Sequence, residues 1–267
     1  MKYLYFLLFF GTQVCYAFQI STGAKSIALQ SQTALIPDGA GTVFTNPSLL
    51  PQISHRSIWF SVFNPYQLRE VQCISSAFSF HFRHLSYGVG FEQLGYKSFK
   101  EQLFNFSIAR NFSDMASLGV SLKYRQIEID RYGSAGQFIL DFGFYIPLTS
   151  LIDFGTRMKN VYHTKLSNTD EIIERELISG IRFMPLSEIA FYVETMHIEH
   201  NSPDLRIATT YSPIRYLQLH VGTGFNSISN FSTGFCLNWY KLNFAYALQN
   251  HPFLSQTHYF TISLEVE

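Results

Sequence analysis

The sequence has few charged residues for its length. Charged side chains make up 14% of the 267 positions, whereas aromatic side chains reach 17%; an average soluble domain carries about 25% charged residues. The formal net charge is +0, so no basic surface points to nucleic acid as a partner. Beyond its N-terminus the chain also lacks an apolar run of about 18 residues, which excludes a bundle of membrane-spanning helices.

Cysteine is equally scarce, with three in the whole chain. Cys15 lies in segment 1–17, where Lys2 precedes a short apolar core, an arrangement typical of a secretory signal peptide. We expect cleavage after this segment and export through the inner membrane. Cys73 and Cys236 lie in well-separated segments, so we expect small packed side chains rather than a disulfide framework.

Helical periodicity is nearly absent, and period-2 alternation takes its place. About fourteen segments have the length of a tilted strand that crosses a bilayer, and about twelve is the alternative count. The predicted strands are 57–63, 72–83, 85–94, 102–110, 117–127, 135–146, 151–161, 175–184, 188–197, 204–212, 216–226, 231–239, 241–249 and 257–266. The sequence therefore predicts an all-β, antiparallel transmembrane β-barrel.

The connections between these strands alternate in length. The short ones are 83–84, 146–149, 185–187, 213–215 and 240–241. The longer, more polar ones are 95–101, 129–133, 163–174, 198–203 and 250–256. Short turns at one rim and longer loops at the other are typical of an outer-membrane barrel, with the short turns on the periplasmic side.

The stretch LSYGVGFEQLGY, residues 85–96, shows how the two faces of a strand differ. Its G-x-G lacks the third glycine and the following helix of a phosphate-binding loop. Tyr87 and Val89 instead share an apolar face, and Gly88 and Gly90 share the other. In a closed barrel the apolar face would meet lipid and the glycine face the lumen. The glycines expected to line the lumen are Gly88, Gly90, Gly222 and Gly224.

Charged residues of the lumen face form a candidate polar cluster. Asp141 shares its parity with Arg157 and Lys159 on the next predicted strand, and Arg125 and Glu92 lie on the same face. One interpretation is an ion pair that holds the wall and a plug together; the other is a contact with a transported substrate.

Aromatic residues gather beside the short turns. Tyr145, Tyr211, Tyr216, Trp239 and Tyr240 lie there, which predicts an aromatic girdle at one membrane interface. The general preference of aromatic residues for strands is the alternative explanation.

The segment before the first strand is rich in small residues, lacks strand alternation and contains Asn46-Pro47-Ser48. We expect a plug inside or beneath the barrel. The predicted organisation is a signal peptide at 1–17, a plug segment at 18–54 and a barrel at 55–267.

Five stretches carry a family resemblance in the same order along the chain. They are GAKSIAL (23–29), DGAGTVFTNPSLL (38–50), YGSAGQFILDFGFYIP (132–147), FGTRMKN (154–160) and YALQNHPFLSQTHYFTISL (246–264). The chain resembles the FadL-type outer-membrane transport barrels, and among them the PorV/PorQ-like branch associated with type IX secretion. The resemblance implies a channel for hydrophobic small molecules in the lipid of the outer membrane. It also implies an alternative, a non-enzymatic component of a secretion system with secretion proteins as partners.

Catalytic and metal-binding patterns are weak. His197 and His200 flank the end of a predicted strand, but a metal site needs further convergent ligands, so we expect a solvated loop there. Serines, histidines and acids are scattered over many strands without a nucleophile motif. We therefore expect neither an enzyme nor a bound cofactor.

Overall fold

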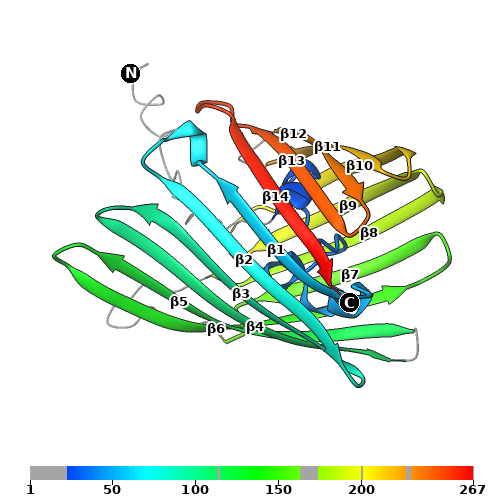
Figure 1. Ribbon diagram of the computed structural model, residues 1–267, viewed down its shortest axis with the longest axis horizontal. Coiled ribbons are helices and arrows are strands. Elements are labelled where there is room, and N and C mark those ends of the chain that lie inside the picture. Colours follow the sequence, from blue (N-terminus) through cyan, green and yellow to red (C-terminus); the bar gives the residue numbers. More distant parts are fainter. Residues whose placement is uncertain (1–22, 113–114, 163–173, 200, 227–229, 267) are drawn as a thin grey trace, which may run out of the picture.

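The computed structural model describes residues 23–112, 115–162, 174–199, 201–226 and 230–266. Its strands form one antiparallel sheet that closes into a barrel (Figure 1). Each strand pairs with its neighbours in the chain, and β1 (Arg56–Phe63) pairs with β14 (Thr257–Val266) to close the ring. The prediction of a fourteen-stranded antiparallel barrel is confirmed, and the alternative of twelve strands is wrong.

The bounds of the other strands agree with the predicted ones to within a few residues. They are β2 (Gln72–Phe82), β3 (Leu85–Tyr96), β4 (Phe99–Phe112), β5 (Ala116–Ile129), β6 (Gly133–Pro147), β7 (Ile152–Lys159), β8 (Glu176–Leu186), β9 (Ile189–Ile198), β10 (Asp204–Ile214), β11 (Leu217–Phe225), β12 (Phe231–Trp239) and β13 (Leu242–Asn250).

Two of the connections expected to be long are short. Strands β3 and β4 stay paired as far as Tyr96 opposite Phe99, which leaves only residues 97–98 in the turn. Strands β5 and β6 likewise stay paired to Ile129 opposite Gly133. Polar residues at these strand ends were interpreted as loop, but polar side chains are compatible with a ladder that extends beyond the membrane. The expected loop at 163–174 lies almost wholly outside the described residues.

Side chains alternate between the outside and the inside of the barrel. On β3, Val89 is 43% exposed, whereas Ser86 and Glu92 are buried. Exposed apolar side chains cover the outer face of most strands: Ile58, Phe60, Phe104, Phe106, Leu122, Phe142, Ile181, Val193, Ile207, Leu219, Val221, Ile262 and Leu264. An apolar exterior on a closed barrel suits contact with lipid.

Aromatic side chains mark the rim that carries the short turns. Trp239 is 69% exposed and Tyr240 is 93% exposed, and Tyr211 and Tyr216 are exposed as well. Tyr145 is an exception, because its hydroxyl donates a hydrogen bond to Asp153 Oδ1 (3.0 Å) on the inner face. The expectation that Tyr145 belongs to an outer girdle is therefore wrong. Tyr145 lies four residues after the buried Asp141 on the same strand, so the two side chains share the inner face.

Residues 23–54, called the inner segment below, lie inside the ring of strands (blue in Figure 1). The inner segment contains α1 (Ala24–Ala28) and two 3-10 helices, η1 (Gly41–Phe44) and η2 (Pro47–Gln52). A third 3-10 helix, η3 (Pro65–Gln67), lies in the β1–β2 connection. None of the described helices is long and apolar enough to span a membrane.

The core of the protein lies between the inner segment and the barrel wall. Helix α1 packs on β12, β13 and β14, while η2 packs on β4, β5 and β6. Trp59 of β1 is only 1% exposed and packs among Val43, Phe44 and Leu50. The inner segment therefore contacts the wall on two sets of strands, β4–β6 and β12–β14.

Candidate functional site

The wall glycines of β3 lie where η1 approaches the barrel. A Cβ atom placed on Gly90 would lie 2.7 Å from the ring Cζ of Phe44, and one placed on Gly88 would overlap the side chain of Val43. Real Cβ atoms essentially never approach other heavy atoms so closely. The two glycines of the 85–96 stretch thus let the inner segment touch the backbone of the wall.

The predicted glycines of β11 also lie on the inner face. A Cβ atom placed on Gly222 would lie 2.8 Å from the backbone nitrogen of Gln30, just after α1. Gly224 lies opposite Arg206 of β10 in the register, which places it on the same inner face.

Asn46 joins the inner segment to itself and to the wall. Its side-chain nitrogen donates to the carbonyl of Ala34 (2.8 Å) and to that of Thr156 on β7 (3.3 Å). Its side-chain oxygen accepts from the backbone nitrogen (3.1 Å) and the hydroxyl (2.7 Å) of Ser48. Pro47 occupies the first position of η2, where the fixed φ of proline suits a helix start. The Asn46-Pro47 pair thus fixes where η2 begins within the inner segment.

A carboxylate of β9 holds a second point of the inner segment. Glu194 Oε2 accepts hydrogen bonds from the backbone nitrogens of Thr33 (2.9 Å) and Ala34 (2.8 Å). On the neighbouring strand β10, Arg206 donates to the carbonyl of Ser31 (2.9 Å) and to Asp204 Oδ2 (2.7 Å). Arg206 is ionised, and a hydrogen bond from an ionised group is about twice as strong as a neutral one, so the carbonyl of Ser31 is held firmly.

Hydroxyl groups of the wall bind further backbone groups of the inner segment. Thr261 Oγ1 accepts from the nitrogen of Ala24 (2.9 Å), and Ser57 Oγ accepts from the nitrogen of Ala40 (3.1 Å). Ser232 Oγ accepts from the nitrogen of Gln30 (2.9 Å). The small polar residues of the lumen face therefore satisfy the irregular backbone of the inner segment, which a buried segment requires.

The structure brings Asp141 and Arg157 of the predicted cluster together. Asp141 is fully buried, and its Oδ2 accepts from Arg157 Nη2 (2.8 Å) and from Lys123 Nζ (2.6 Å). Its Oδ1 accepts from the backbone nitrogen of Asn160, just after β7 (3.1 Å). One carboxylate thus ties β5, β6 and β7 together. Lys123 shares a strand face with Arg125, two residues further along β5, but it was not among the residues predicted for the cluster.

The other three predicted residues have different partners. Lys159 pairs with Glu176 (3.3 Å), and Arg125 pairs with Glu101 (2.5 Å). Glu92 accepts a hydrogen bond from Ser75 Oγ (2.8 Å). They share the inner face with Asp141 but do not contact it in a single cluster, so the wall carries a series of local ion pairs. A further pair, Arg182 with Asp153 (2.5 Å), was not anticipated.

The described residues contain no group of three or more histidine, cysteine or acidic side chains placed to hold a metal ion. His197 is exposed, and His200 lies outside the described residues. Cys73 and Cys236 are both buried free thiols. His220 Nε2 lies 3.2 Å from Cys236 Sγ, but Cys236 is 0% exposed and packs beneath α1, so a substrate would not reach this pair.

No protein family matches the sequence, and no curated protein matches it either. Solved structures do match. The toluene transporter TbuX of Ralstonia pickettii superposes with a TM-score of 0.72 at 10% identity, over 94% of this chain and 100% of that chain. This chain has the fold of that transporter. Two other solved structures superpose similarly. The toluene transporter TodX of Pseudomonas putida has a TM-score of 0.66 at 8% identity, over 90% of this chain and 96% of that chain. A FadL homologue of Pseudomonas aeruginosa has a TM-score of 0.61 at 8% identity, over 91% of this chain and 97% of that chain.

Proposed function

We propose that the protein is an outer-membrane channel of the FadL type that passes small hydrophobic molecules, with the inner segment as its plug. The observation that carries the proposal is the buried inner segment itself, held inside a closed barrel by side chains of the wall. The same fold in two toluene transporters supports a hydrophobic substrate. The apolar exterior supports a place in lipid, and export by the predicted signal peptide would deliver the chain there.

The interactions that hold the plug suggest how it opens. Backbone hydrogen bonds to Glu194, Ser232, Ser57 and Thr261 are spread around the barrel. A substrate that competes for part of this surface would loosen one stretch of the inner segment while the others stay bound. The plug would then shift locally rather than leave the barrel.

Uptake of radiolabelled toluene by cells that carry the protein in their outer membrane, compared with cells that lack it, tests this function, because toluene crosses a plain phospholipid bilayer unaided. Glu194→Gln weakens the contacts to Thr33 and Ala34, and we expect it to raise both uptake and single-channel conductance. Thr195→Val is the matched control, because Thr195 is the next residue of the strand and is exposed on the outer face. Uptake no faster than by cells that lack the protein, for both the native protein and Glu194→Gln, would refute the channel.

The secretion alternative is not part of the proposal. The solved structures that this barrel resembles are transporters and a FadL homologue, and none is described as a secretion component. A catalytic role is not part of the proposal either.

A further inference from the structure

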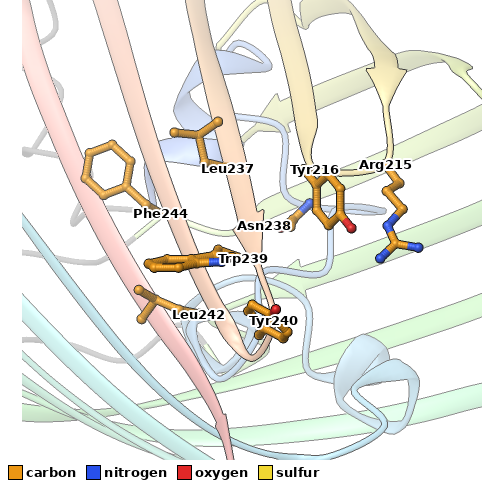
Figure 2. Close-up of a pocket in the computed structure, with 8 residues that line it drawn as sticks. All are labelled: Arg215, Tyr216, Leu237, Asn238, Trp239, Tyr240, Leu242 and Phe244. Carbon is orange, nitrogen blue, oxygen red and sulfur yellow. The ribbon is translucent and has the colours of Figure 1, made fainter.

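A groove lies on the outer surface of the barrel at the short-turn rim (Figure 2). Its volume is about 830 Å³, within the range of about 300–1,000 Å³ that ligand pockets occupy. The residues that line it are Arg215, Tyr216, Leu237, Asn238, Trp239, Tyr240, Leu242 and Phe244. They come from the β10–β11 turn and from the hairpin of β12 and β13.

The groove has an apolar floor and a cationic edge. Leu237, Trp239 and Leu242 project from the outward face of the hairpin and are exposed. The guanidinium of Arg215 lies over the ring of Tyr216, 4.5 Å from its centre. Figure 2 shows Trp239 and Leu242 on one side of the β12–β13 turn and Tyr216 and Arg215 on the other.

Arginines placed over aromatic rings recur along this rim. Arg83 lies over Phe82 (5.4 Å) beside the β2–β3 turn, and Arg110 lies over Phe112 (5.2 Å) at the end of β4. All three such contacts of the described residues are at the short-turn end of their strands. Each guanidinium is charged, and stacking holds it beside the exposed aromatic residues of this rim, at the level where lipid head groups would lie.

We propose that this groove binds one anionic glycerophospholipid of the periplasmic leaflet, with its phosphate at Arg215 and an acyl chain along Leu237, Trp239 and Leu242. The inference rests on the proposed membrane location but not on transport. Charge complementarity selects the occupant, because a planar guanidinium binds phosphate oxygens in pairs. Lys241 lies in the adjacent turn but does not line the groove, and Arg215 is the one charged residue among those that line it. Arg215 is therefore the cation that faces the phosphate.

Tryptophan fluorescence can report this groove selectively. The protein has two tryptophans, and Trp59 is buried inside the barrel while Trp239 lines the groove. The purified full mature protein in detergent is titrated with phosphatidylglycerol or phosphatidylcholine brominated on an acyl chain. Bromine quenches tryptophan on contact, so we expect phosphatidylglycerol to quench Trp239 at a concentration at least about fivefold lower than phosphatidylcholine does, as one basic contact to anionic lipid implies.

Arg215→Gln should abolish the preference for phosphatidylglycerol while leaving the weaker quenching by phosphatidylcholine unchanged. Arg83→Gln is the matched control, since Arg83 also stacks on an aromatic ring at this rim but does not line the groove; it should keep the full preference.

Equal quenching by the two lipids, or equal effects of the two substitutions, would overturn the proposal. The proposal would also be overturned if the fluorescence of Trp239 changed with protein concentration in the absence of lipid, because a second copy of the protein would then occupy the groove. Toluene uptake is measured separately, so a failed channel with selective quenching would leave the lipid site standing.

Discussion

Gly222→Ala is a direct test of the contact between the inner segment and the barrel wall. The added methyl group would lie 2.8–2.9 Å from three atoms of Leu29 and Gln30. Ordinary contact begins near 3.4 Å, so the inner segment has to retreat by about 0.6 Å. The hydrogen bond from Gln30 N to Ser232 Oγ, now 2.9 Å, would then stretch to the limit of a useful bond.

The overpacked methyl group and the stretched hydrogen bond together give an estimate of the loss in the free energy of unfolding. Overpacking costs about 1–3 kcal/mol, and a weakened hydrogen bond costs up to about 1 kcal/mol. Replacing glycine by alanine within a strand returns about 0.5–1 kcal/mol of backbone entropy. We expect the free energy of unfolding to fall by about 1–3 kcal/mol.

The fluorescence of Trp59 provides the measurement. Trp59 Nε1 donates to Asp38 Oδ2 of the inner segment (3.1 Å), so its emission reports whether the plug is docked. In a Trp239→Phe background, urea unfolding in phospholipid vesicles is followed at Trp59 alone. Gly180→Ala is the control, because a Cβ atom there would lie 3.3 Å or more from its neighbours. Equal midpoints for Gly222→Ala and Gly180→Ala would show that the plug does not rest on β11.

The remaining predictions concern the ion pairs and the orientation. Asp141→Asn leaves Lys123 and Arg157 buried with a weakened partner, and we expect a loss of about 3–5 kcal/mol in the free energy of unfolding; an unchanged urea midpoint would contradict this. In a background without native cysteines, a cysteine at exposed Phe253 should react with an impermeant thiol reagent on intact cells, whereas one at Ser187, at the short-turn rim, should not. The opposite labelling pattern would invert the proposed orientation.

Much of the barrel could be predicted because period-2 alternation is a local property. The fourteen strands follow from runs such as 85–96, where each residue's face depends only on its neighbours. The same parity placed Gly88, Gly90 and Gly222 on the inner face, against the inner segment. Tyr145 was assigned by its distance from a turn rather than by its parity, and for that reason it was placed on the wrong face.

The partners of the lumen charges could not be predicted in the same way. Asp141 lies opposite Ser121 in the register, yet it pairs with Lys123, two residues further along β5. Long side chains reach such diagonal neighbours as easily as direct ones. Several partners were therefore open to each charge until the register was fixed, which is why Lys159 and Arg125 belong to other pairs.

The position of the inner segment near the start of the chain has a consequence for assembly. Ala24 binds Thr261, 237 positions later, and Gln30 binds Ser232, 202 positions later. Ala24 and Gln30 thus find these two binding partners only when β12 and β14 have been made. Contacts between such distant residues slow folding, so docking of the plug and closure of the ring by β1 and β14 are expected late and together. A barrel that lacks β14 would leave Ala24 without its Thr261 partner, while the bonds of Thr33 and Ala34 to Glu194 of β9 would remain possible.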